Sequence, residues 1–183
     1  QSWLLNPKFN INNFTSASFS GGLSNFGDIG IVFLKKSISN VQPNIVITKD
    51  EASQLVKSKE VFIAGWGKNI PNQKTNGLKY CGTSFINELG MHEMQIGGDS
   101  TSTHKCGGDS GGPTFMNVNT AHKRIERIIG VTSRGYDMQS NKICSKGGID
   151  TRVDAHFDWI DQEMKKACTN KTRTWCKIEG IIP

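Results

Sequence analysis

The stretch Cys106-Gly-Gly-Asp-Ser-Gly-Gly-Pro113 decides how the rest of the chain is interpreted. Glycines surround Ser110, so the backbone can turn tightly there and a ligand can approach it closely. A serine in such a turn offers its Oγ as a nucleophile, while its own N–H and that of Gly108 can point at a developing oxyanion. The alternative is a glycine-rich turn with an incidental serine.

Gly108 to Pro113, Gly-Asp-Ser-Gly-Gly-Pro, resembles the nucleophile motif of the chymotrypsin-like (trypsin-fold) serine peptidases. Other stretches resemble that family in the same order along the chain, from about residue 5 to about residue 165. They are Asn6-Pro7-Lys8-Phe9, Gly27–Leu34, Ala64–Gly67, Gly130–Gly135, Thr151-Arg152-Val153 and Phe157–Ile160.

The resemblance implies a role for four residues. Ser110 would be the nucleophile, and Asp28 would orient a base histidine and stabilise its charged form. The N–H groups of Gly108 and Ser110 would form the oxyanion hole. Asp109 would be the activation-linked carboxylate, which in this family pairs with the new N-terminal amine after activation of the zymogen. For Asp28, the alternative is a carboxylate that caps a strand at a turn.

The base histidine itself is absent from its expected place. In the family it precedes the triad aspartate, yet no histidine precedes Asp28. The histidines of the chain are His92, His104, His122 and His156. We therefore expect an N-terminal segment, absent from this chain, to supply the base.

The resemblance implies an all-β fold with two six-stranded antiparallel β-barrels. Residues 1–59 would form the end of the first barrel and the connection between barrels, and residues 60–152 the second barrel. Residues 153–183 would form a C-terminal helix and a disulfide-looped tail. Short apolar runs and 20 glycines fit an all-β protein with many turns.

Local patterns place several elements. Residues 28–35 predict a strand buried on both sides, and residues 61–64 and 78–86 predict further strands. A hairpin is expected from 114–116 and 124–133. The segment 87–103, which carries a helix and a disulfide-bridged loop in the family, looks shortened here.

A helix is expected near the end of the chain. Phe157, Ile160, Met164 and Ala167 recur at helical spacing, and Asp154 is a suitable N-cap. We expect the apolar stripe to dock on the barrel.

The substrate-binding strand is expected at Ser133-Arg134-Gly135, whose backbone would pair with an extended peptide. Arg134 stands where the family usually has tryptophan. Asp150 stands where a tyrosine is usual, and Gly147 where a proline is usual. Because of these departures, the substrate preference of the family members is difficult to transfer to this chain.

The primary specificity pocket is expected around His104, Lys105, Gly135 and Gly148. The aspartate that selects Arg or Lys in trypsin-like members lies six residues before the nucleophile, and His104 stands there instead. Cleavage after Arg or Lys is therefore not expected. His104 and Lys105 could favour an acidic or polar side chain. In the alternative, Lys105 extends to solvent and neutral His104 lines a polar or apolar slot.

Five cysteines indicate an oxidising compartment, hence a secreted or extracytoplasmic protein. The resemblance implies a Cys106–Cys144 bridge, and Cys168 and Cys176 are close enough in sequence to form a local loop. Cys81 is left over: it could pair with a cysteine of the N-terminal segment, or stay a buried free thiol.

Composition excludes several other functions. The 22 basic and 16 acidic residues give a net charge of +6, but the basic residues are dispersed and no aromatic residues interleave with them. We expect no nucleic-acid partner. No apolar run approaches the roughly 20 residues of a membrane span, and no metal or cofactor is implied.

We therefore predict a serine endopeptidase that acts on proteins or peptides once it is joined by its N-terminal part. The alternative is a catalytically inactive homologue that serves as a binding or regulatory module. A carrier or lectin-like adhesin has no support beyond the basic surface.

Overall fold

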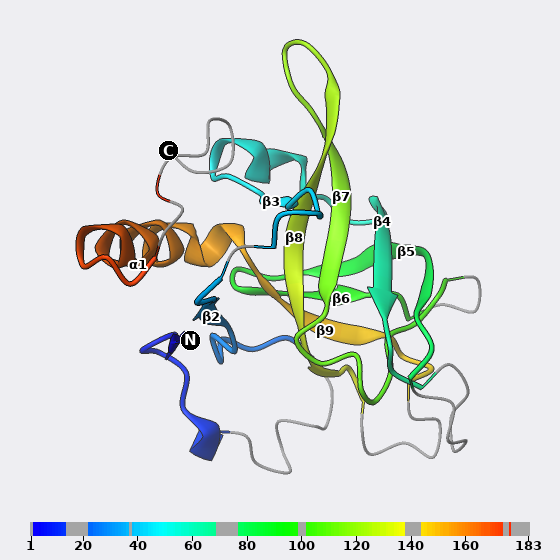
Figure 1. Cartoon of the computed structure of the whole chain (residues 1–183). Helices are drawn as coiled ribbons and strands as arrows, with labels where there is room; N and C mark the ends of the chain where they lie inside the picture. The colour runs from blue at the N-terminus through cyan, green and yellow to red at the C-terminus, as the bar shows by residue number, and fades with distance from the viewer. Residues whose placement is uncertain are drawn as a thin grey trace.

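The computed structural model describes residues 2–13, 22–36, 38–68, 77–98, 102–137, 144–173 and 176 of the chain. Nine strands, three short 3-10 helices and one α-helix occupy these ranges (Figure 1). In chain order they are β1 (Ser2–Leu5), η1 (Ile11–Asn13), β2 (Gly30–Phe33), β3 (Ile45–Val46), η3 (Asp50–Gln54), β4 (Glu60–Gly65), β5 (Tyr80–Leu89), β6 (Glu93–Ile96), β7 (Pro113–Asn119), β8 (Arg124–Gly135), β9 (Gly148–Arg152), η4 (Asp154–His156) and α1 (Phe157–Thr169).

Six strands form a closed antiparallel barrel. The hydrogen-bonded order is β7-β4-β5-β6-β9-β8, and β8 pairs again with β7, so no edge is left open. Closure of this kind removes the unpaired edges that make open sheets prone to aggregation. The strand β3 adds outside the barrel, parallel to β8. The predicted all-β fold with a C-terminal helix is confirmed.

The barrel strands follow the sequence pattern. In β7, Thr114, Met116 and Val118 are buried and alternate with half-buried residues, as expected when one face of a strand packs inward. The predicted strands at 61–64 and 78–86 are β4 and β5, and the predicted hairpin is β7–β8. That hairpin extends beyond the barrel in Figure 1.

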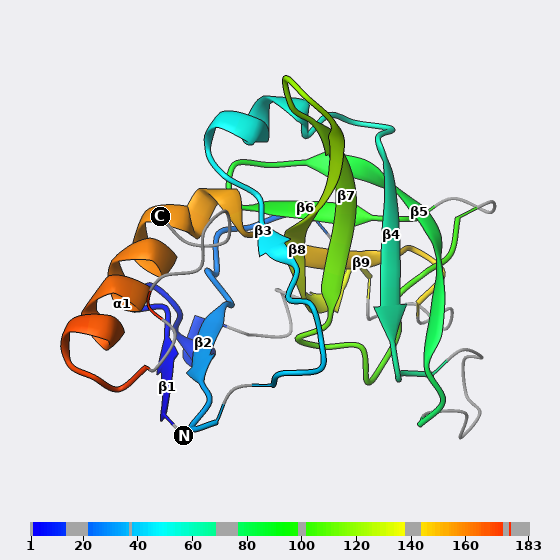
Figure 2. The same cartoon turned by 45° about the horizontal axis from the view of Figure 1, so that its top comes forward.

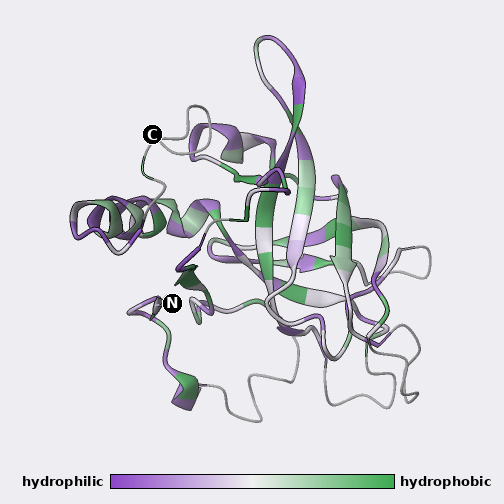
Figure 3. Ribbon diagram, viewed as in Figure 1, coloured by the Kyte–Doolittle hydropathy of each residue, from purple (hydrophilic) through white to green (hydrophobic). Residues whose placement is uncertain are grey.

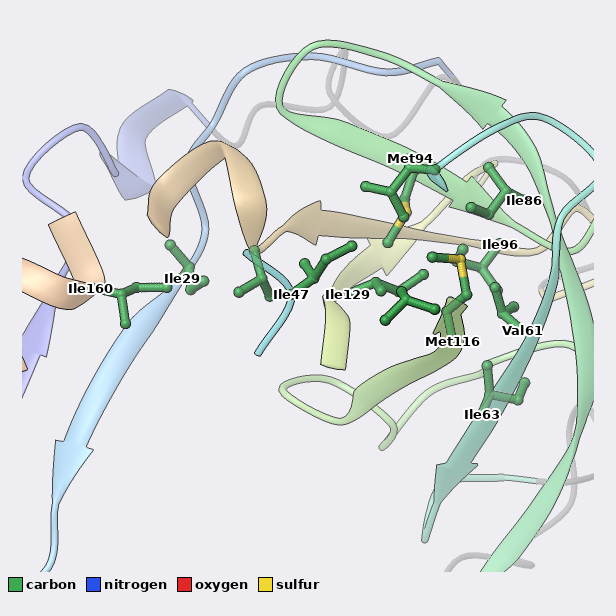
Figure 4. Packing of buried hydrophobic residues seen from close by; sticks show 13 residues of the cluster. Ile29, Ile47, Val61, Ile63, Ile86, Met94, Ile96, Met116, Ile129 and Ile160 are labelled. Carbon is green, nitrogen blue, oxygen red and sulfur yellow. The ribbon is translucent and has the colours of Figure 1, made fainter. Parts of the chain in front are cut away.

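The core fills the inside of this barrel. Met94, Ile96, Met116 and Ile129 are fully buried and lie together with Ile86 (Figure 4). The same cluster continues to Ile29 and Ile160, outside the barrel wall. One continuous core therefore connects the barrel, the terminal helix and the segment before β2.

Two elements differ from expectation. The strand β6 lies within the segment 87–103, for which we expected only a shortened form of the family's helix and loop. Its residues Glu93 and Gln95 are both buried. Asp154 does not cap α1. Its carboxylate accepts hydrogen bonds from the Arg152 guanidinium at 3.2 and 2.6 Å, and the helix follows η4 without a side-chain cap.

The helix α1 docks on the rest of the molecule through the predicted stripe. Ile160 and Ala167 are buried, and Met164 packs against the core, while the opposite face carries charged residues (Figure 3). Lys165 pairs with Asp161 on that outer face, at 2.7 Å. The alternation of apolar and charged residues thus fixes which side faces inward.

The strands β1 and β2 form a separate two-stranded sheet beside α1 (Figure 2). Phe33 is buried, but Trp3 is 68% exposed and Val32 is 55% exposed. The strand predicted at 28–35 is therefore present as β2, but within this chain only one of its faces is covered.

A buried polar contact holds this sheet to the helix. The Asn6 side chain donates to the carbonyl oxygen of Gly27 at 3.0 Å and lies 3.2 Å from Nδ1 of His156. The His156 ring is buried, 5.8 Å from the ring of His92. Burial lowers the pKa of His156, and the nearby His92 and Lys8 lower it further, against the opposite effect of Asp154.

Replacing Met94 by Ala should lower the free energy of unfolding by about 2–5 kcal/mol, because it opens a cavity in a fully buried site. Met91 is 80% exposed and provides a control of the same residue type, for which the change should stay within about 0.5 kcal/mol. Chemical denaturation of the natural protein measures both. An equal loss of unfolding free energy in the two variants would contradict the burial of Met94 in the core.

The lowered pKa of His156 predicts a pH dependence of stability. Below about pH 6.5 the unfolded histidine binds a proton that the folded one does not. The contribution of His156 to the free energy of unfolding should therefore be fully present above pH 6.5. It should be lost as the pH falls towards the lower pKa of the folded state. Denaturation of the natural protein at pH 7.5 and 5.5 measures the loss, which should be smaller in His156→Gln. Identical losses in both proteins would rule out His156 as a cause.

Candidate active site

Ser110 lies exposed on a loop made of two consecutive turns. The N–H of Asp109 donates to the carbonyl of Cys106 at 3.0 Å, and the N–H of Gly112 donates to the carbonyl of Asp109 at 2.9 Å. Gly108 adopts a φ of 100°, a backbone conformation that side chains with a Cβ rarely take. The glycines therefore allow the loop to hold Ser110 outward.

The carboxylate of Asp109 holds this loop against the turn that follows β4. One oxygen accepts the N–H of Gly67 at 2.9 Å, and the other accepts the N–H of Cys106 at 2.9 Å. A Cβ on Gly65 would lie 1.9 Å from that carboxylate, so the two glycines of the Gly65-Trp66-Gly67 turn provide the space for it. Two sequence motifs that lie 42 residues apart thus form one structure.

Backbone hydrogen bonds attach the same loop to β8. The N–H of Gly111 donates to the carbonyl of Thr132 at 2.8 Å, and the N–H of Thr132 donates to the carbonyl of Gly112 at 2.9 Å. The Thr132 hydroxyl also donates to Gly112, at 2.9 Å. Ser133 is the next residue along β8, so it lies close to the loop that carries Ser110.

Asp28 contacts the same part of β8, and also β9. The Ser133 hydroxyl donates to the Asp28 carboxylate at 2.7 Å, and the Thr151 hydroxyl donates to the Asp28 carbonyl at 2.9 Å. The β8–β9 register shifts between Thr132 and Arg134, which leaves Ser133 as the extra residue of a bulge. Bulges re-aim side chains in this way near active sites. The structure thus brings Asp28 and the Ser110 loop to the same short stretch of β8.

The disulfide Cys106–Cys144 joins the start of this loop to the segment before β9, with Cα atoms 5.1 Å apart. A second disulfide, Cys168–Cys176, closes a short loop at the end of α1. Cys81 is a free thiol and is exposed. The alternative of a buried free thiol is therefore wrong, and pairing with a cysteine of an N-terminal segment stays a prediction.

A cleft of about 370 Å³ lies beside Asp109. Its lining comes from β4 and the turn after it, from the start of β5 with Cys81, from the loop leading to Ser110, and from Cys144 and Ser145. His104 is half-buried in this lining. A Cβ on Gly97 would lie 2.8 Å from Nδ1 of His104, which places that nitrogen against the end of β6.

Lys105 does not extend to solvent, and that alternative is wrong. The residue is 4% exposed, and its ammonium forms an ion pair with Asp150 at 2.8 Å. The Lys105 Nζ also donates to the hydroxyls of Thr114 at 2.5 Å and Thr132 at 2.6 Å. Burial lowers the pKa of the Lys105 ammonium, while Asp150 acts in the opposite direction.

Arg134, predicted in the substrate-binding strand, also turns inward. Its guanidinium makes two hydrogen bonds to the Glu93 carboxylate, at 2.9 and 2.8 Å, and lies 4.6 Å from the centre of the Phe26 ring. Glu93 further accepts the N–H of Ser24 at 2.7 Å. The pair thereby holds the segment that leads to Asp28 against β6 and β8.

The two predicted pocket glycines face each other. Gly135 pairs with Gly148 in the β8–β9 ladder, and Gly148 is buried. The sequence did not reveal Glu93, Thr114 or Thr132 as parts of the site. Nothing in their local pattern distinguishes them from ordinary strand residues, and only the unusual Asp150 hinted at a changed environment.

Within the described ranges, no group of three or more His, Cys, Asp or Glu residues is arranged to hold a metal ion. The same ranges contain no helix with the length and apolar character needed to cross a bilayer.

Comparisons with known proteins agree with this geometry. The family model described as Trypsin matches residues 6–160. The Spaetzle-processing enzyme of Drosophila melanogaster is 31% identical over 159 residues, which cover 75% of this chain and 38% of that protein. Complement factor I of Rattus norvegicus is 33% identical over 112 residues, 54% of this chain and 17% of that protein.

A solved structure of mouse neuropsin, a serine protease, superposes with a TM-score of 0.66 at 20% identity, covering 90% of this chain and 70% of neuropsin. That likeness supports the fold alone. The chain spans less than half the length of these two curated relatives. With the family model matched over most of its length, the chain belongs to the trypsin family of serine peptidases.

Proposed function

We propose that the protein is a serine endopeptidase in which Ser110 is the nucleophile and Asp28 orients the base. The main support is the hydrogen bond from Ser133 to Asp28, which fixes a carboxylate next to the loop that exposes Ser110. The β8 bulge makes this contact possible. A carboxylate held in this way can keep an imidazole in the tautomer that accepts the serine proton.

The reaction would proceed by acyl transfer. Ser110 Oγ attacks the scissile carbonyl while a histidine accepts its proton, and the C–N bond then breaks as the histidine protonates the departing amine. Water, deprotonated by the same histidine, then attacks the ester. The bond between the acyl carbon and Ser110 Oγ breaks as the histidine returns the proton to Oγ, which releases the acid and restores the serine. The N–H groups of Gly108 and Ser110 would stabilise the oxyanion in both steps.

The base histidine would come from a segment outside residues 1–183. The chain spans 38% of the Spaetzle-processing enzyme, which leaves room for such a segment. Within the described residues, no hydrogen bond of the chain's own histidines goes to Ser110 or Asp28. The exposed faces of Trp3 and Val32 would be covered by the same segment.

The cleft beside Asp109 would receive the amine that activation cleavage creates. Asp109 already accepts N–H groups from Gly67 and Cys106, and an added ammonium would strengthen this arrangement through a charge-assisted hydrogen bond. Cys81 lines the cleft as an exposed thiol. It would form a disulfide with a cysteine of the N-terminal segment.

Substrate would pair with the backbone of Ser133-Arg134-Gly135. The side chains of Arg134 and Lys105 are occupied by Glu93 and Asp150, so they would shape the site from behind. The proposed domain limits, 1–59, 60–152 and 153–183, follow the same assignment, although β3 already pairs with β8 of the second barrel. Two disulfides support an extracytoplasmic location.

Ser110→Ala should abolish labelling by a fluorophosphonate and lower peptidase activity by several orders of magnitude. The exposed side chain has little packing, so the thermal midpoint should not change. The test uses the whole natural protein, including any companion segment seen by denaturing electrophoresis and mass spectrometry. Wild-type protein that is folded, oxidised and activated yet unlabelled would indicate the inactive homologue instead.

Gly108→Ala should lower kcat by about 10²–10³, because a Cβ at φ 100° would strain the backbone and misdirect the oxyanion-hole N–H. That Cβ would also lie 3.0 Å from Cα of Gly67. Gly107→Ala is the matched control, because nothing lies within 4 Å of its Cβ position, and its kcat should hardly change. Equal effects at both positions would argue against an oxyanion role for Gly108.

A further inference from the structure

We infer that the buried Lys105–Asp150 ion pair makes the primary specificity pocket short and electrically neutral, so that the enzyme cleaves after small, uncharged residues. This inference rests on the proposed peptidase function and names its substrate class. It follows from the donors that Lys105 uses, from the charge that Asp150 cancels, and from the space that the Lys105 side chain fills.

The three N–H donors of the Lys105 ammonium all have partners. They are directed at Asp150, at the Thr114 hydroxyl and at the Thr132 hydroxyl, at distances of 2.5–3.0 Å. A lysine has three donors and no acceptor. Lys105 therefore has no donor left for a substrate carboxylate, which removes it as a selector of Glu or Asp.

The charge of Lys105 is balanced by an equally buried partner. Asp150 is fully buried and accepts a further hydrogen bond from the Thr114 hydroxyl at 2.5 Å. The Thr132 hydroxyl is fixed as well, since it donates to the carbonyl of Gly112. A complete network of this kind is costly to open, because removal of one partner leaves an uncompensated buried charge.

The Lys105 stem packs beside Gly148, one of the two glycines predicted to line the pocket. A Cβ on Gly148 would lie 3.5 Å from Cβ of Lys105 and 4.0 Å from its Cδ, at ordinary contact distance. Gly148 pairs with Gly135, and both lie on strands that would flank the residue before the scissile bond. The methylene groups of Lys105 therefore limit the space beside Gly148.

These three observations select one class of side chain. A bulky residue before the scissile bond would have to displace the Lys105 stem and break the ion pair. A charged residue would find no uncompensated charge on Lys105 or Asp150 with which to pair. An alanine, serine or similar small residue needs neither change.

The test labels the whole natural protein with four peptidyl diphenyl phosphonates that differ only in the residue next to phosphorus: Ala, Phe, Glu or Lys. A fluorophosphonate without a peptide serves as a measure of Ser110 reactivity. We expect the Ala probe to react at least about tenfold faster than the other three. The ranking should be the same at pH 5.5 and pH 8.

Two double variants distinguish the effect of side-chain volume on specificity from the effect of charge. Lys105→Ala with Asp150→Ala removes both charges together and opens the space beside Gly148, so the Phe-to-Ala rate ratio should rise by about tenfold or more. Lys105→Met with Asp150→Leu keeps that space filled without charge, so the preference for Ala should remain. Reaction of each variant with the fluorophosphonate shows that its active site is formed.

The outcomes distinguish this inference from the proposed function. If the fluorophosphonate labels the natural protein but the Phe, Glu or Lys probe reacts fastest, the inference is wrong and the peptidase remains. An unchanged Phe-to-Ala ratio in a labelled Lys105→Ala, Asp150→Ala variant also overturns it. If the activated natural protein reacts with no probe, including the fluorophosphonate, the proposed function itself fails.

Discussion

The structure depends on strand β8, which is hydrogen-bonded to three other strands. It pairs with β7 and β9 to close the barrel, and β3 adds to it from outside. Near its C-terminal end the same strand meets the loop that carries Ser110 through Thr132, and the Asp28 segment through Ser133. The bulge between Thr132 and Arg134 makes these two contacts compatible, because it allows consecutive residues to serve different neighbours. Closure of the fold and assembly of the candidate site are therefore consequences of one strand.

Near this strand, charged residues that are usually solvated are buried as ion pairs. The Arg134–Glu93 pair links β8 to β6 across β9, the Lys105–Asp150 pair links the loop before Ser110 to β9, and both pairs are almost fully buried. Such pairs contribute less to stability than their short distances suggest, because removing two charges from water offsets much of their attraction. Their effect is geometric: each partner has one arrangement in which its hydrogen bonds are satisfied, so the walls of the site have little freedom to rearrange.

The sequence predicted the parts of this molecule that depend on local backbone chemistry. The glycine-rich loop at Ser110, the strands with clear alternation and the apolar stripe of α1 are all present. The strand β6 was missed because its polar residues find buried partners that lie far away in the sequence, as Glu93 does with Arg134, 41 residues later. Lys105 was misjudged for the same reason, since its partner Asp150 becomes a neighbour only when the barrel closes. Asp154 has the composition of an N-cap, yet a nearby guanidinium from Arg152 binds its carboxylate instead.

The barrel and the β1–β2 sheet differ in how strongly hydrogen bonds hold them against local unfolding. Every barrel strand is bonded on both sides, so its amide hydrogens should exchange with solvent only when the barrel opens as a whole. Among the residues that the structure describes, β1 and β2 pair only with each other. The Asp28 segment is held to the barrel mainly by side-chain contacts. Local opening of this region costs less than global unfolding, and it carries Asp28 away from Ser133. Mild heat or denaturant should therefore release Asp28 from Ser133 while the barrel is still folded, so the proposed activity should be lost before the β-structure.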